Sequence, residues 1–215
     1  MRETTPTWSD LATGRRWRGV ASFIRGWVGP FDSSCGMSAE ELDQLLLRKS
    51  LALPAAVREW YLLAARWSQG QGALNVWIGP QELAAEDGMV EVLTDTIGNN
   101  NWGVRAADHD IEDPPVYDLD TNPTQIDFPS FTSLVAAMIV NDVIFGSDTD
   151  EPKELNPGVA RAGLTCFVSN RRGDFYADAV LDAAAVVMFA YPGNGPAYGK
   201  ARTPAGHTLL QRFQR

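Results

Sequence analysis

The chain has 215 residues, of which 45% are hydrophobic and 21% charged, and its formal net charge is -9. This composition is typical of a globular protein that can bury a core, and seven tryptophans argue against disorder over most of the length. The longest uninterrupted apolar run, 183–191, is far shorter than the roughly 20 residues of a membrane helix. The first residues also lack the apolar segment of a secretory signal, so we expect a cytoplasmic protein.

The residues before Met37 predict one N-terminal amphipathic helix, which we assign to the segment 1–36. Its apolar side chains recur at helical spacing, with arginines between them: Trp17, Val20, Ile24, Trp27 and Val28. A basic helix of this kind can lie on a membrane surface. Packing against a protein core is the commoner outcome, and it is the one we expect here.

Two further helices are predicted from their starting signals. Ser38 and Glu41 form the Ser-x-x-Glu pattern of a capping box, so a helix is expected over 39–49. Pro54 has the residue type favoured at the first position of a helix, which should end near Trp67. The glycines of 69–72 then break the chain.

Short extended segments follow at 74–78, 89–93, 102–104 and 116–117. The last of these comes directly after two prolines, so it should begin at, or lie along, a sheet edge. A strong helix is expected over 131–144, then a polar linker over 148–157. The tail offers strands at 164–168 and 186–191 and a last helix from Thr203.

The order of these elements, helices then strands then a helix, indicates an α+β fold. We expect N-terminal helices packed on a mainly antiparallel sheet within an α+β core, 37–146. A C-terminal α/β extension, 147–215, should dock on that core, because its apolar residues would be costly to expose.

The negative charge is concentrated in one segment. Residues 86–127 contain eleven acids and a single cation, Arg105, while the rest of the chain is close to neutral. This distribution argues against direct nucleic-acid binding and favours a basic protein partner. The alternative is a solvated face that only aids solubility. The acids expected to protrude toward a partner are Asp108, Asp110, Glu112 and Asp118.

Motifs for catalysis or cofactor binding are incomplete. His109 lies among acids that could hold a metal, but neighbouring residues of an extended chain point to opposite faces. The stretch from Asp118 begins like a calcium loop and fails at Pro123 and Pro129. The glycines from Gly193 fit no nucleotide fingerprint and are interpreted as a connection between a strand and a helix. We therefore predict no cofactor, no metal and no enzymatic activity.

Several of these features together resemble the SUKH superfamily, which includes bacterial immunity proteins and relatives of a yeast cell-wall-synthesis regulator. The resemblance covers about 37–146, and its motif residues are Pro54, Trp102, Gly103, Asp113, Pro114, Pro115 and Val116. It implies an α+β fold without catalysis, and cytoplasmic neutralisation of a toxin domain that is often a nuclease or deaminase.

Three hypotheses follow. The first is an immunity protein that binds a basic toxin domain, and the second is a regulatory interaction module of the same fold with another partner. The third is a metal-dependent enzyme that uses His109 and its neighbouring acids.

Overall fold

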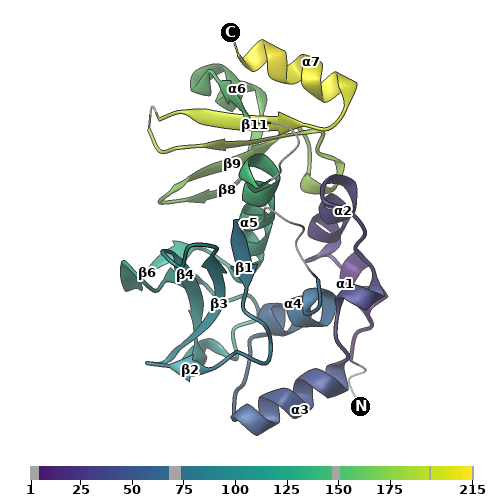
Figure 1. Cartoon of the computed structure of the whole chain (residues 1–215), viewed down its shortest axis with the longest axis vertical. Helices are drawn as coiled ribbons and strands as arrows, with labels where there is room; N and C mark the ends of the chain where they lie inside the picture. Colours follow the sequence, from purple (N-terminus) through teal and green to yellow (C-terminus); the bar gives the residue numbers. More distant parts are fainter. Residues whose placement is uncertain (1–4, 68–73, 147–150, 194, 215) are drawn as a thin grey trace.

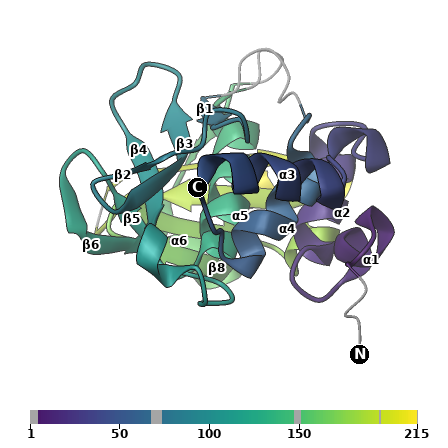
Figure 2. The ribbon, with the colours of Figure 1, turned by 90° about the horizontal axis from the view of Figure 1, so that it is seen from below.

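The computed structural model describes residues 5–67, 74–146, 151–193 and 195–214. Within them, helices come first, two antiparallel sheets follow, and a helix lies at the C-terminal end (Figure 1). The α+β prediction is confirmed. Seen from below, one sheet stands on one side and the N-terminal helices on the other (Figure 2).

The N-terminal segment forms two helices where the sequence predicted one. They are α1 (Trp8–Thr13) and α2 (Arg18–Trp27), followed by a short 3-10 turn, η1 (Ser33–Cys35). Thr7 and Asp10 cap α1 reciprocally. The predicted apolar stripe is buried at Trp17, Val20 and Ile24, which join the main core rather than facing outward.

The next two helices are α3 (Ala39–Lys49) and α4 (Ala55–Ala64). The Ser38–Glu41 capping box is present, so the prediction for α3 is confirmed. Pro54 is the N-cap of α4 rather than its first helical residue, and α4 ends before Trp67. The predicted break at 69–72 lies outside the described residues.

The first sheet, which we call sheet A, has the strand order β1-β3-β4-β5-β6, with β2 paired to β3. Its strands are β1 (Asn75–Trp77), β2 (Ala85–Glu86), β3 (Met89–Asp95), β4 (Asn101–Arg105), β5 (Val116–Asp118) and β6 (Asn122–Phe128). A short 3-10 turn, η2 (Ala106–Asp108), follows β4. β5 begins after the prolines as predicted, but it lies inside the sheet. One edge strand is β6, which was not predicted from the sequence and which accommodates Pro123.

Helix α5 (Phe131–Phe145) lies between the two sheets (Figure 1). Ten of its fifteen residues are buried, including the predicted Val135, Met138, Ile139 and Val143. A helix that is apolar around most of its circumference needs partners on several sides. It has them in β6, β8 and β10.

The second sheet, sheet B, has the order β7-β11-β10-β9-β8. Its elements are β7 (Lys153–Leu155), α6 (Pro157–Gly163), β8 (Thr165–Asn170), β9 (Gly173–Ala177), η3 (Leu181–Ala183), β10 (Val186–Ala190), β11 (Ala197–Ala201) and α7 (Pro204–Phe213). The predicted polar linker therefore contains β7, and β9 and β11 were missed. The glycines from Gly193 join two strands of a hairpin, so the predicted strand-to-helix connection is wrong.

Sheet B packs on the N-terminal half through shared core residues. Val168, Phe175, Val187 and Phe189 belong to the same buried cluster as α2, α4 and α5. The Trp27 indole Nε1 donates a hydrogen bond to the Ala184 carbonyl at 3.0 Å. The opposite face of sheet B forms a smaller core with α6 and α7. Among the described residues, no helix is long and apolar enough to cross a membrane.

Candidate protein-interaction surface

The structure divides the eleven acids of residues 86–127 by what surrounds each carboxylate. Two are buried against arginines, three accept hydrogen bonds from nearby amides, and the rest are exposed or partly exposed. Burial shields only the first two from a partner, since Asp120 of the second group is also exposed. Sequence position alone did not separate these groups, because all eleven lie in one segment.

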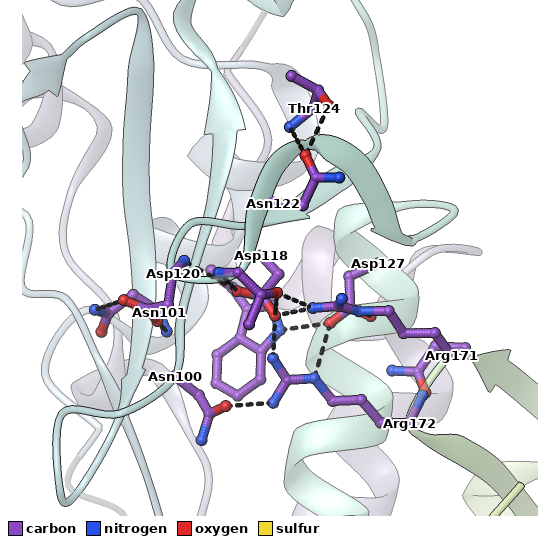
Figure 3. A network of polar contacts seen from close by, with 12 residues as sticks. Asn100, Asn101, Asp118, Asp120, Asn122, Thr124, Asp127, Arg171 and Arg172 are labelled. Carbon is purple, nitrogen blue, oxygen red and sulfur yellow. Dashed lines mark hydrogen bonds and ion pairs between the residues drawn. The ribbon is translucent and has the colours of Figure 1, made fainter.

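Asp118 and Asp127 form a buried ion-pair cluster with Arg171 and Arg172 (Figure 3). Asp118 is 1% exposed and contacts both guanidinium groups. The Asp127 carboxylate accepts a hydrogen bond from Arg171 Nε at 3.0 Å and another from the Trp102 indole Nε1 at 2.8 Å. The prediction that Asp118 protrudes toward a partner is wrong, because two cations from sheet B cover it.

The arginines of this cluster come from the tight turn between β8 and β9, where Asn170 Oδ1 accepts the backbone N–H groups of Arg172 and Gly173. Burial raises the pKa of Asp127, although the hydrogen bond from Trp102 and the charge of Arg172 oppose that shift. The sequence does contain an Arg-Arg-Gly turn between two strands. Nothing in it indicated that these cations would reach acids more than forty residues earlier.

Asp95, Asp113 and Asp120 have local structural roles. Asp95 accepts the backbone N–H groups of Ile97 and Asn99 in the turn before β4. Asp113 Oδ1 accepts the N–H of Thr132 in the first turn of α5, at 3.0 Å. Asp120 accepts hydrogen bonds from the backbone and side chain of Asn101.

Five of the remaining six acids gather at one end of sheet A, which we call the acidic end, and the sixth, Glu91, lies within β3. The acidic end consists of Glu86, Asp87, Asp108, Asp110 and Glu112. The turn between β2 and β3 and the turn η2 meet there, since Ala106 N donates to the Gly88 carbonyl at 2.8 Å. Three of the four predicted partner-facing residues therefore lie together, with two further acids beside them.

One member of the acidic end has an internal cation. Arg16 contacts both Glu112 and Glu59, the latter at 2.7 Å, although the Glu112 side chain is still 80% exposed. Within the described residues, Glu86, Asp87 and Asp108 have no cation within ion-pair distance, and Asp110 has only His109, at 3.5 Å.

His109 does not gather the neighbouring acids around one point. Its Nδ1 lies 3.2 Å from the Ala106 carbonyl and its Nε2 faces Asp110. In the part of the chain that the structure describes, no group of three or more His, Cys, Asp or Glu side chains is arranged to hold a metal ion. In the calcium-like stretch, the Asp118 carboxylate is already used within the chain, since its Oδ1 accepts the N–H groups of Asp120 and Thr121.

The residues on which the SUKH resemblance rests lie at helix starts, in the core or in close packing contacts. Pro54 stands at the N-cap of α4, Asp113 accepts the N–H of Thr132 in the first turn of α5, and Trp102 donates to Asp127 as described above. Pro114 and Val116 are buried and Pro115 is half-buried at the start of β5. Gly103 packs closely, because a Cβ there would lie 2.8 Å from the Val90 carbonyl oxygen.

No protein-family model, curated protein or solved structure matches this chain. The resemblance to the SUKH superfamily therefore stays a prediction, and any functional argument has to come from the geometry of the chain itself.

Proposed function

We propose that this chain is a non-catalytic immunity protein that binds and neutralises a basic toxin domain in the cytoplasm of the cell that makes it. The observation that carries the proposal is the acidic end of sheet A. Glu86, Asp87 and Asp108 stand there without internal cations among the described residues, and Asp110 and Glu112 extend the same surface. Like charges held together repel one another, and a basic partner relieves that repulsion.

The chemistry of nucleic-acid-directed toxins supports this choice of partner. A nuclease or deaminase domain needs a positive surface to hold phosphates, and that surface is accessible to an acidic inhibitor. Complementary fields also speed association, which matters when a toxin must be captured before it acts. The buried ion-pair cluster adds no net charge to this surface, because Arg171 and Arg172 balance the carboxylates of Asp118 and Asp127.

The test is to sequence the genes on either side and to co-express with this chain any toxin domain that they encode, with cell survival as the readout. The parent chain should protect, and Asp108→Lys/Asp110→Lys should protect less. A matched control, Glu151→Lys/Glu154→Lys, changes the charge equally at exposed residues of the C-terminal half and should protect like the parent. Binding without protection would favour the regulatory module instead, and neither binding nor protection would reject the immunity function.

A further inference from the structure

The strand register of sheet A places one residue from each of four neighbouring strands in a row across the sheet. Glu91 of β3 is directly opposite Gly103 of β4, Gly103 is opposite Tyr117 of β5, and Tyr117 is opposite Ile126 of β6. Residues directly opposite one another in an antiparallel sheet share a face. We call these four residues the outer row.

The direction of the outer row follows from its neighbours. Val90 and Val104, which alternate with Glu91 and Gly103 along their strands, are buried in the main core. Because successive side chains of a strand point to opposite faces, the outer row must face away from that core. Tyr117 agrees with this: it is only 3% exposed, yet it belongs to neither hydrophobic cluster.

Tyr117 is covered by other side chains of the same face. The Arg105 guanidinium lies over its ring, with the guanidinium carbon 4.4 Å from the ring centroid. The Leu119 side chain, two residues further along, fills the space above Gly103, about 3 Å from where a Cβ would be. Ile126 completes the patch and is 52% exposed.

Glu91 is the acid of this patch, which also holds the Arg105 guanidinium over Tyr117. Within the described residues no cation pairs with Glu91, and its surroundings disfavour ionisation. Partial burial, reinforced by the nearby Asp120 and Glu86 carboxylates, raises the pKa of Glu91. A cation brought by a partner would reverse that unfavourable situation, and the apolar neighbours would exclude water around the pair.

We propose that the outer row, together with Leu119 beside it, is the docking surface for the basic partner, which lays an apolar side chain on Leu119 and Ile126 and places a lysine or arginine against Glu91. This inference rests on the proposed function for the existence of a basic partner. The acidic end lies beside the same face, joined to it through β3 and β4. It steers the partner by long-range attraction, whereas the outer row holds it.

The test uses two defined probes and the full chain labelled with nitrogen-15. One probe is a short peptide of alternating lysine and leucine, and the other has serine in place of leucine. The first should perturb the amide resonances of Glu91, Leu119 and Ile126 and bind more tightly. Glu91→Gln and Ile126→Ser should each weaken its Kd about tenfold, with thermal unfolding confirming that both variants fold.

Equal binding of the two peptides would overturn the docking surface, as would shifts confined to Asp108 and Asp110 or unchanged affinity in both variants. The survival assay separates this failure from failure of the proposed function. If the parent protects cells and Glu91→Gln and Ile126→Ser protect equally well, the immunity function stands and the outer row is wrong. If the parent gives no protection but the lysine–leucine peptide binds the outer row as expected, the outer row stands as a docking surface and the immunity function is wrong.

Discussion

Arg172 lies over the indole of Trp102, with its guanidinium carbon 4.8 Å from the ring centroid. Arg172 belongs to the turn between β8 and β9 in sheet B, and Trp102 belongs to β4 in sheet A. The same guanidinium donates to Asn100 at 2.6 Å and contacts Asp118. One side chain therefore joins the two sheets through a cation–π contact, a hydrogen bond and an ion pair.

Arg172→Ala should destabilise the fold strongly. The substitution leaves Asp118 and Asp127 buried with half of their compensating charge, and breaking such a pair costs about 3 kcal/mol. Urea unfolding measures the change. Arg15→Ala, at an exposed arginine, is the control and should stay within about 0.5 kcal/mol of the parent. A loss for Arg172→Ala as small as that of the control would contradict a role for the cluster in joining the sheets.

Gly103→Ala should also destabilise, for a steric reason. The new methyl group would lie 2.8 Å from the Val90 carbonyl oxygen and 3.0 Å from Leu119 Cδ1, inside a central strand. Overpacking of this kind costs about 1–3 kcal/mol. The matched control is Gly158→Ala, where a Cβ meets only Asn156 Oδ1, at 3.5 Å. Thermal unfolding should show a clear loss for the first variant and almost none for the second.

The elements with strong local signals were predictable from sequence. The Ser38–Glu41 capping box fixes the start of α3, and the apolar run of α5 is long enough to identify a helix without knowledge of its partners. The strand β6 was missed because Pro123 and its polar neighbours do not alternate in the usual way. It exists because it pairs with β5, and the pairing is a tertiary effect.

The candidate site was predictable only in part, for the same reason. Asp108, Asp110 and Glu112 lie in a short polar segment after β4, where local sequence already indicates exposure. Asp118 looks equally exposed in sequence, but two arginines more than fifty residues later cover it. The outer row joins residues of four strands, so it becomes visible only once the strand register is known.

Asp142→Asn should change how stability depends on pH. Asp142 Oδ1 accepts the Leu74 N–H at 2.9 Å and the Asn75 Nδ2 at 2.7 Å, while its buried Oδ2 has no hydrogen-bond partner among the described residues. Burial raises the pKa of Asp142 to about 7, from an ordinary value of 3.8. The folded state therefore holds this proton more tightly than the unfolded state does.

The sign follows from proton linkage. The stabilising contribution of the protonated Asp142 is complete below the unfolded pKa and is lost as pH rises through the folded pKa of about 7. Asparagine does not titrate, so the free energy of unfolding of Asp142→Asn should gain on the parent by about 1 kcal/mol or more between about pH 4 and about pH 8. Asp10→Asn is the control and should run almost parallel to the parent over this range, because hydrogen bonds from Thr7 lower the pKa of Asp10 and its titration lies mainly below about pH 4. Parallel pH profiles for Asp142→Asn and the parent would contradict this.

The acidic end should control the rate of partner association more than the lifetime of the complex. Asp108 and Asp110 lie at the surface, where charges act at long range and salt screens them. Asp108→Lys/Asp110→Lys should lower the association rate constant for the toxin domain about tenfold and flatten its dependence on ionic strength. Glu112 is left in place because its partner Arg16 also contacts Glu59, and reversing the charge of Glu112 would disturb that internal pair.

The measurement is binding kinetics at two salt concentrations, with Glu151→Lys/Glu154→Lys as a variant of equal charge change. If the two charge-reversed proteins associate at the same rate, net charge alone explains the effect. If Asp108→Lys/Asp110→Lys keeps the parent's rate and salt dependence, the acidic end is a solvated surface with no part in steering.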